Sequence, residues 1–566
     1  MSQPPTSIER ETGRRRWPWI TGVVVAVVVV LVVVVVVAGG SGGDRTGGRD
    51  GPPVRGGTLQ FAMIDFQRTP DVQAGSNYAE SIIGNNVTDK LTWQDPTTGA
   101  ITPWLATSWS YNPQLTEFTF HLRDDVTFSD GTPFDAAVVK ANFDQYVHGA
   151  PQLGIKPNGA PYLPGYLDTL TPDPHTVVVR FAAPNASFLQ ASSFTANNQP
   201  GFLSLSTLAT SAQQRTNPRN VIGTGPFVYE SWTEQVSTVL DRRPGYHWAP
   251  PALHHRGEAY LDRIVFNVVP EASVRTGSLS SGSVDAILDV QPTDEASLIQ
   301  QGFPVQSGKV AGADIRFDFN LSLAPTNDLA VRKAVQLGWD RQKIARTVLS
   351  PSYRMSTSVL ADSVAGYVDH GHDALRYDPA QARQLLDQAG WRPGPDGIRQ
   401  KDGKTLTIKL SGIDNLVVNK PAYESIQQDL RAIGIDLELT IVPIPQATAN
   451  QAHALTDWNI IASNRSRDDP SVLDTAFNPA LDNSAYIPAD LPGRDRLVEG
   501  LTRIETTLDP RLRAQYAATA QDLVLDEFAL TNPVYTPAQV IAHSRSVHGI
   551  VFDAQARNHF VDTWKG

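Results

Sequence analysis

Two adjacent carboxylates and two adjacent imidazoles are the residues best suited to chemistry in this sequence. Asp468 and Asp469 are of the type that transfers protons as a general acid and base. Pro470 follows them, however, and this run is more typical of a loop that caps a helix. His254 and His255 offer metal-ligating nitrogens, but adjacent side chains rarely converge on one ion, and no carboxylate–histidine spacing accompanies them. We therefore predict neither a catalytic pair nor a metal site from these residues.

The glycine-rich segments do not complete a phosphate-binding motif. Gly223-Thr224-Gly225 lacks the third glycine of a dinucleotide-binding turn, and the spacing within Gly397–Thr405 is one residue too long for a P-loop. The Asp402-Gly403 pair indicates a hairpin turn instead. The sequence has no His-Glu-x-x-His or Gly-x-Ser-x-Gly motif and no cysteine, with 3 methionines and 12 scattered histidines. We expect a protein that is not an enzyme and has no catalytic residues, no cofactor and no metal site.

Length and composition predict a large globular body. The chain has 566 residues, which suggests about three or four folding units at roughly 150 residues each. It is 41% hydrophobic and 19% charged, as in ordinary globular proteins. The net charge is −11, although residues 1–55 carry more arginines than acidic residues, so the body itself is acidic. Because nucleic-acid binding depends on clustered basic residues, we exclude nucleic acid as a partner.

The N-terminal segment has the pattern of a transmembrane anchor or a signal peptide. Trp17–Ala38 is uncharged and valine-rich, and at ~1.5 Å per residue it spans about 33 Å, enough for the hydrocarbon core. Arginines precede it, so residues 1–16 are expected as a cytoplasmic basic tail and the body on the extracytoplasmic side. Residues 39–57 form a Gly-rich linker. We expect a single-pass protein of the cell membrane, or a secreted protein if the segment is a cleaved signal.

Strands and helices alternate through the body, which predicts an α/β or α+β class. Apolar residues alternate in Glu117–Arg123, which is typical of a half-buried strand. Asp340 stands where a helix N-cap is expected, and Pro379 stands in the first turn of another helix. We expect strands at 58–63, 117–123, 175–181, 261–269, 283–288, 315–321 and 436–442, helices at 136–147, 271–280, 329–338, 341–349, 379–389 and 422–432, and a hairpin at 397–410.

Short motifs follow one another along the body. The longest is FTFHLRDDVTFSDGTP at Phe118–Pro133, and GTGPF follows at Gly223–Phe227. The other motifs are Arg55–Leu59, Pro103–Trp109, Gly245–Trp248, Ser281–Asp285, Val331–Val335, Asp378–Trp391 and Ile433–Asp436. In these residues and in their order, the chain resembles the extracellular solute-binding proteins of family 5, which serve peptide- and nickel-type ABC importers. The likeness covers about Arg55 to Ile550.

The resemblance implies an α/β fold of the two-lobed, periplasmic-binding-protein-like kind (class II). Such a fold has a hinge and, in this family, an additional subdomain in lobe I; here one N-terminal transmembrane helix would precede it. Lobe I is expected at 58–95, 215–312 and 535–566, its inserted subdomain at 96–214 and lobe II at 313–534. A ligand would lie in the interlobe cleft, and hinge closure around it would produce the form that a permease recognises.

The resemblance also implies a function and partners. We expect a monomeric substrate-binding protein that delivers small peptides or peptide-like solutes to ABC permease and ATPase subunits, held at the membrane by its N-terminal helix. Two alternatives stay open. One is a ligand-binding receptor or chaperone on the same fold without a role in transport. The other is an importer receptor for a glycoside or for an anionic or acylated compound.

In peptide-binding members of the family, the segment that corresponds to Asp457–Pro470 contacts the ligand. It supplies an aspartate for the peptide's α-ammonium group and a tryptophan platform. Aligned on the Asp-Pro pair at the end of the segment, these two positions hold Ser466 and Ser463. If the register slips, Asp468 takes the aspartate's role. Otherwise the ligand lacks a free ammonium group, since that charge needs compensation in a dry cleft.

A ligand without a free ammonium group could instead carry negative charge and be bound by basic side chains. Arg465 and Arg467 would then bind carboxylate or phosphate groups, or else they are solvated loop residues. Further candidates come from loops expected to face the cleft. The candidate ligand-binding residues are therefore Phe66, Asp289, Gln291, Asn320, Ser463, Asn464, Arg465, Ser466 and Asp468.

Overall fold

The structure is a computed structural model. It describes residues 51–566 apart from residues 76, 160–162, 197–200, 415, 444–445, 448, 451–453 and 482–485. The expected cytoplasmic tail, the apolar segment 17–38 and most of the expected linker lie outside the described residues. Within the described ranges, no helix has both the length and the apolar character needed to cross a membrane.

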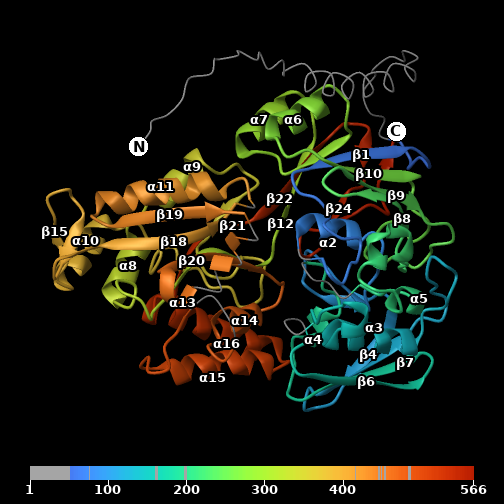
Figure 1. The fold of residues 1–566 in the computed structure, drawn as a ribbon, viewed down its shortest axis with the longest axis horizontal. Helices are drawn as coiled ribbons and strands as arrows, with labels where there is room; N and C mark the ends of the chain where they lie inside the picture. Colours follow the sequence, from blue (N-terminus) through green and yellow to red (C-terminus); the bar gives the residue numbers. More distant parts are fainter. Residues whose placement is uncertain are drawn as a thin grey trace, which may run out of the picture. The chain divides into compact units, whose positions relative to one another are not determined.

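A seven-stranded sheet forms the base of the first lobe. Strand β1 lies parallel to β10 on one side and to β11 on the other, while β8, β9, β12 and β22 add antiparallel partners. Figure 1 shows blue β1 beside green β10 and β9, although these segments are far apart in the sequence. In spatial order the strands are β12 (Val305–Lys309), β22 (Ala538–His543), β11 (Ala286–Leu288), β1 (Thr58–Met63), β10 (Arg263–Val268), β9 (Ser237–Arg242) and β8 (Phe227–Thr233).

A six-stranded sheet forms the second lobe. Strand β18 pairs in parallel with β19 and β20, and the fully buried β13 pairs antiparallel with β20 and β21. In Figure 1 helix α11 (Asn419–Ala432) runs along β18 and β19. The spatial order is β14 (Arg354–Met355), β21 (Thr531–Thr536), β13 (Gly312–Phe319), β20 (Ile460–Ser466), β18 (Thr407–Ile413) and β19 (Asp436–Val442).

The chain passes between these two sheets at two short connections. The first runs from β12 to β13 through Val310 and Ala311, and the second runs from β21 to β22 through Pro537 alone. Two short connections that lie between the same pair of sheets are the arrangement that permits hinge motion of two lobes. The expected limits of the lobes and of the inserted subdomain stay predictions.

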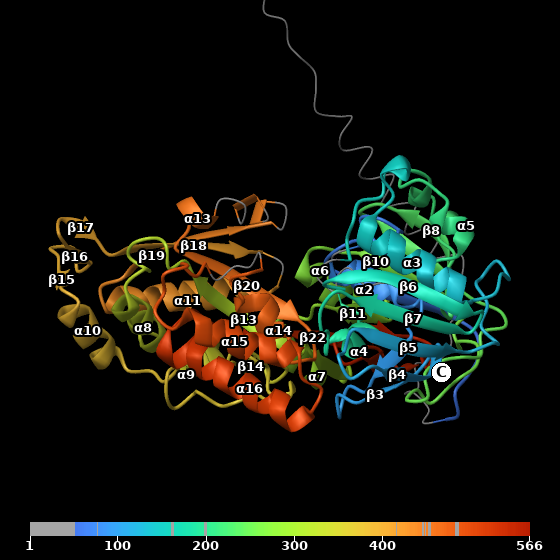
Figure 2. The ribbon, with the colours of Figure 1, turned by 90° about the horizontal axis from the view of Figure 1, so that it is seen from below.

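A third sheet has four strands, which lie along the chain after β3 and before β8. Helix α3 (Ala136–His148) packs against it, as Figure 2 shows beside β6 and β7. Phe118 and Phe120 on β5 meet Phe181 and Phe188 in edge-on ring contacts, which fill its core. The strands are β4 (Ala106–Tyr111), β5 (Glu117–Leu122), β7 (Thr176–Phe181) and β6 (Tyr166–Asp173).

The remaining elements cover the three sheets and connect them. The other helices are α2 (Tyr78–Gly84), α4 (Phe188–Ala191), α5 (Leu205–Leu208), α6 (Ala272–Ser280), α7 (Pro292–Gln300), α8 (Leu329–Leu337), α9 (Arg341–Thr347), α10 (Pro379–Gln388), α13 (Ala454–Asp457), α14 (Val472–Phe477), α15 (Arg494–Glu505) and α16 (Pro510–Asp522), with a π-helical turn at Leu523–Glu527 and 3-10 turns at Pro151–Leu153, Gln214–Thr216 and Pro218–Asn220. The short strand pairs are β2 (Thr92–Gln94) with β3 (Ile101–Pro103), β23 (Val547–His548) with β26 (Trp564–Lys565), and β24 (Val551–Phe552) with β25 (Asn558–His559), and β15 (Arg392–Pro393), β16 (Arg399–Lys401) and β17 (Lys404–Thr405) form a small sheet.

Most of the expected strands and helices are confirmed. Where the observed bounds differ from the expected ones, strand pairing explains the difference. The Asp340 carboxylate accepts a hydrogen bond from the Lys343 N–H and caps α9, as expected. Strand β13 begins at Gly312, earlier than the expected start at 315, because it pairs with β20 from that residue onward. The expected hairpin at 397–410 is only partly right. Strand β17 pairs with β16, but β18 leaves the hairpin and joins the central sheet of lobe II.

The Gly-Thr-Gly turn at 223–225 passes very close to the chain after α2. An ideal Cβ on Gly225 would lie 2.5 Å from the Val87 carbonyl carbon, and one on Gly223 would lie 2.1 Å from the Val87 oxygen. The Gly225 N–H donates to that same oxygen over 2.8 Å. Glycine is therefore required here because two backbone segments touch.

Replacing Gly225 by alanine is expected to lower the free energy of unfolding by about 1–3 kcal/mol, since the new methyl group meets backbone atoms that cannot rotate away. The control is Gly277→Ala in the exposed part of α6, where a Cβ meets nothing within 4 Å. That variant is expected to be more stable by up to ~1 kcal/mol because alanine favours the helix. Urea unfolding of both variants checks the pair, and equal midpoints would contradict the packing argument.

Candidate ligand-binding site

The carboxyl ends of parallel strands meet at one edge of the first sheet. Strand β1 ends beside β11, and the Ile64 N–H after β1 donates to Asp289 Oδ2 after β11 over 3.2 Å. Asp289 has a φ of +59°, a left-handed backbone conformation that few residues other than glycine adopt but that aspartate tolerates. Burial raises the pKa of Asp289, and the charge of Arg275 opposes this rise. In open α/β sheets, ligands bind at this edge, and Asp289 lies there.

Strand β20 brings a second carboxylate to the side where the chain changes sheets. Its last residue, Ser466, pairs with Gly312, which directly follows the first connection. Two residues further, the Asp468 carbonyl accepts a hydrogen bond from Gln94 Nε2 of the first lobe over 2.8 Å. The Asp468 carboxylate accepts no hydrogen bond from any described residue. Burial and the charge of Asp469 raise the pKa of Asp468 to about 7.

Three tyrosines from both lobes lie near Asp289. The ring of Tyr353 lies edge-on to Tyr535, with centroids 6.2 Å apart. Burial raises the pKa of Tyr353, and the charges of Asp289 and Glu295, followed by the nearby Tyr78, add to this rise, so Tyr353 lies near groups of the first lobe. The Tyr78 hydroxyl is buried and has no hydrogen-bond partner among the described residues. Such a hydroxyl is available to a polar ligand.

The remaining candidates in lobe I and at the far end of β13 have structural contacts. Phe66 lines a small internal cavity with Met63, Ile83 and Trp232, and Gln291 directly precedes α7. Asn320 is buried, and its amide donates to the Trp458 carbonyl over 3.3 Å. It follows the end of β13 that pairs with Ile460, about 23 Å from the end that pairs with Ser466. The structure therefore does not bring Asn320 together with the residues after β20.

The candidate residues Ser463–Ser466 form the end of strand β20, so Arg465 does not lie in a loop. The Ser463 hydroxyl accepts a hydrogen bond from Arg316 over 3.4 Å, and Asn464 and Ser466 are half-buried. Arg465 is exposed, as the alternative that it is a solvated residue predicts. That alternative is wrong for Arg467, which is 4% exposed and donates to Ser471 over 3.3 Å.

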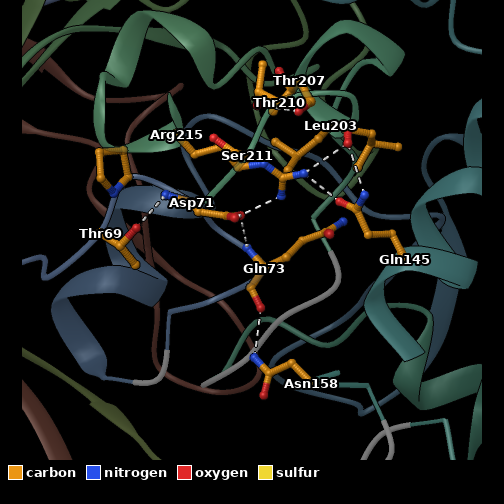
Figure 3. A network of polar contacts seen from close by, with 12 residues as sticks. Thr69, Asp71, Gln73, Gln145, Asn158, Leu203, Thr207, Thr210, Ser211 and Arg215 are labelled. Carbon is orange, nitrogen blue, oxygen red and sulfur yellow. Dashed lines mark hydrogen bonds and ion pairs between the residues drawn. The ribbon is translucent and has the colours of Figure 1, made fainter. Parts of the chain in front are cut away.

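A polar network fixes the loop that follows β1 against the inserted subdomain. Figure 3 shows the Arg215 guanidinium between Asp71 and Gln145, with ion-pair and hydrogen-bond distances of 2.8 and 2.5 Å. Both members of the ion pair are almost fully buried. The Gln73 carbonyl also accepts from Asn158 over 2.7 Å. Asp71, Gln73, Gln145 and Asn158 line a cavity of about 360 Å³, and their bonds position the loop after β1.

Sequence reasoning missed Tyr78, Tyr353 and Tyr535. Each has an apolar body and a polar tip, as expected of a ligand contact, but their convergence depends on how the lobes meet. Two α/β lobes joined by short connections, with carboxylates and aromatic hydroxyls where they meet, define the class of two-lobed solute-binding proteins.

The chain belongs to the bacterial extracellular solute-binding proteins, family 5, whose model ("family 5 Middle") matches residues 100–486. It is 28% identical to the nickel-binding periplasmic protein of Escherichia coli (strain K12) over 367 residues, 60% of this chain and 63% of that protein, so this match spans less than two thirds of the relative. It is 24% identical to the glutathione-binding protein GsiB of Salmonella paratyphi A (strain ATCC 9150 / SARB42) over 467 residues, 79% of this chain and 82% of that protein.

A solved structure supports the fold. NikA from Brucella suis in complex with Fe(III)-EDTA aligns with a TM-score of 0.77 at 24% sequence identity, covering 90% of this chain and 100% of NikA. The chain is thus a two-lobed, extracytoplasmic substrate-binding protein of the ABC-importer type.

Proposed function

We propose that this protein captures peptides or peptide-like solutes between its lobes and delivers them to an ABC permease, without catalysing a reaction. In this proposal Trp17–Ala38 holds it at the membrane as a single helix, and the body acts as a monomer outside the cytoplasm. The peptide class is supported by the glutathione-binding relative, whereas the nickel-binding relative supports a metal-containing solute.

The observation that carries the peptide proposal is the Asp468 carboxylate. It is partly buried, lies beside the contact between Gln94 and the second lobe, and has no partner among the described residues. A carboxylate in such a place is destabilised until a cation joins it, as its pKa of about 7 indicates. The α-ammonium group of a peptide supplies that cation. Asp468 therefore takes the anchoring role for which Ser466 is unsuited.

Contacts between the lobes support delivery by closure. Besides Gln94 and Asp468, the Ala186 N–H donates to the Glu505 carbonyl over 2.8 Å, and the Ser352 hydroxyl donates to Glu295 over 2.9 Å. These bonds join the inserted subdomain and α7 to elements of lobe II. A ligand that binds the closed form more tightly than the open form then shifts the balance toward closure.

A second ligand class, anionic or acylated compounds, is favoured by a different observation. Arg467 Nη2 is buried and has no hydrogen-bond partner among the described residues. A buried guanidinium donor of this kind pairs well with carboxylate or phosphate oxygens. Exposed Arg465, two residues earlier and near the end of β20, adds positive charge.

The test uses the purified full chain. Small molecules released on denaturation are identified by mass spectrometry, and a thermal-shift screen compares free-amine peptides, their N-acetylated forms, glycosides and organic anions. A ligand at about 100 times its Kd stabilises the folded form by about 2.7 kcal/mol, which such a screen detects. Stabilisation by free-amine peptides alone supports the proposal. Stabilisation only by blocked or anionic compounds would move the assignment to the second class.

A further inference from the structure

A buried histidine and two aspartates meet on lobe II, outside the interlobe residues described above. His370 lies between β14 and α10, Asp522 is the last residue of α16, and Asp526 lies on the π-helical turn Leu523–Glu527. One potential ligand atom from each of the three residues lies within 4.8 Å of the other two. His370 is 2% exposed, so its ring is held in place by packing.

The distances in this cluster suit a metal ion at its centre. His370 Nε2 lies 3.0 Å from Asp522 Oδ1 and 3.4 Å from Asp526 Oδ2. Two ligand atoms that are each about 2.0–2.1 Å from one ion, at tetrahedral or octahedral angles, are themselves about 2.9–3.4 Å apart. The two distances from the ring nitrogen therefore already match those of a coordination sphere, and the two carboxylate oxygens lie within 4.8 Å of each other.

The hydrogen bonds on the other side of the ring determine which nitrogen carries the proton. His370 Nδ1 lies 3.1 Å from the Val368 carbonyl and 3.4 Å from the Ser358 hydroxyl. The Ser358 hydroxyl donates its hydrogen to Gln521 over 2.8 Å, so both neighbours of Nδ1 act as acceptors. Nδ1 therefore carries the hydrogen. The lone pair of Nε2 in the neutral ring then points at two carboxylates, which is unfavourable without a cation between them.

The surroundings leave a path to the cluster. Asp526 borders a cavity of about 270 Å³ that Lys333, Gln336, Asp373 and Arg376 also line. The cavity gives an ion access and gives water room to complete its coordination. The side chains of Asp522 and Asp526 are 63% and 44% exposed, so both carboxylates stay reachable from solvent.

We propose that His370, Asp522 and Asp526 bind a divalent transition-metal ion of the zinc class, with water as the remaining ligand. One imidazole and two carboxylates form a donor set that Zn²⁺ accepts, and a backbone carbonyl orients the imidazole as in known zinc sites. The ion connects the segment after β14 to the end of α16 and so stabilises lobe II. It is a resident ion and is independent of the solute proposed above. Sequence analysis predicted no metal site, because His370 and Asp522 are 152 residues apart.

The test titrates zinc chloride into the chelator-treated full chain by calorimetry and repeats the titration with Asp522→Asn and Asp526→Asn. We expect one site in the wild type and an affinity at least tenfold lower in each variant, because each loses a ligand. The control is Asp373→Asn, which removes the same charge from the same cavity and is expected to change the affinity by less than about threefold. Crystals soaked in zinc should show anomalous scattering between the three side chains.

The alternative is that a second proton makes His370 a cation and no ion binds. In that case the wild type takes up no zinc, or takes it up unchanged when Asp522 or Asp526 is replaced, and the proposal is wrong. Anomalous scattering located only between the lobes would also overturn it. Neither result affects the solute proposal, which the peptide screen tests separately.

Discussion

Replacing Arg316 by methionine is expected to lower the free energy of unfolding by about 3–5 kcal/mol, because it leaves a buried carboxylate without its cation. Arg316 and Asp318 project from the same face of β13, are both fully buried and form an ion pair of 2.9 Å. The guanidinium also lies 5.3 Å from the Phe477 ring. Thr531 donates to Asp318 over 2.7 Å, but a neutral hydroxyl cannot replace the lost charge. Urea unfolding followed by circular dichroism measures the change.

Two comparisons separate burial from the ion pair itself. Arg263 and Asp241 form a pair of 2.6 Å whose side chains are 45% and 33% exposed, so Arg263→Met is expected to change stability by less than about 1 kcal/mol. The double variant Arg316→Met with Asp318→Met should recover most of the loss, since an apolar pair of similar volume suits the core. If Arg316→Met behaves like Arg263→Met, the buried pair does not stabilise lobe II in this way.

Replacing Asp468 by asparagine is expected to weaken the binding of free-amine peptides by about 2–4 kcal/mol, which corresponds to about 30- to 1000-fold in Kd. The amide keeps the size of the side chain but removes the charge that pairs with the ammonium group. N-acetylated forms of the same peptides should bind both proteins with similar affinity. Isothermal titration calorimetry with matched peptide pairs measures the difference.

The matched variant is Asp289→Asn, which removes the other carboxylate from the interlobe region. We expect a smaller loss there, because Asp289 already accepts a backbone hydrogen bond from Ile64 and lies near Arg275. If Asp289→Asn shows the larger loss with free-amine peptides, the anchor is Asp289. If neither variant distinguishes free from blocked peptides, the peptide proposal fails.

The pKa of Asp468 adds a pH dependence with a definite sign. A pKa of about 7 in the folded state, above the ordinary 3.8, means that the folded form holds the proton more tightly than the unfolded form. The stability from this group is therefore greatest below about pH 4 and falls as the pH rises through about 7. Asp468→Asn removes this fall, so it should be more stable than wild type by up to about 4 kcal/mol at pH 8 and nearly equal to it at pH 4.

Ligand binding has the opposite pH dependence. Only the ionised carboxylate attracts an ammonium group, so the affinity of the wild type for free-amine peptides should decrease as the pH falls below about 7. The decrease approaches tenfold per pH unit, because a proton then competes directly with the ligand. A residue that binds solute at the expense of stability is expected at a functional site. A pH-independent affinity between pH 5 and pH 8 would exclude Asp468 as the anchor.

Much of the fold was predictable because its signals are local. Alternating apolar residues identified β5, and an aspartate before an amphipathic run identified the start of α9. The ordered motifs indicated the family, and the family model supports that assignment. The pairing of strands that are far apart along the chain was harder to predict from the sequence. The residues of β18 look like one arm of a hairpin, but they form a central strand because β19 and β20 lie on either side.

Residue periodicity, capping residues and turn glycines act over a few residues, so the amino-acid sequence was enough to identify the family, the class and the individual strands and helices. The chemistry of particular side chains depends instead on tertiary contacts. Asp468 and Asp469 are neighbours, yet Asp469 pairs with Arg513 over 2.7 Å while Asp468 has no described partner. His370 gains its two carboxylates only through packing against the end of α16. Burial and charge pairing depend on segments far apart along the chain, and no local pattern encodes them.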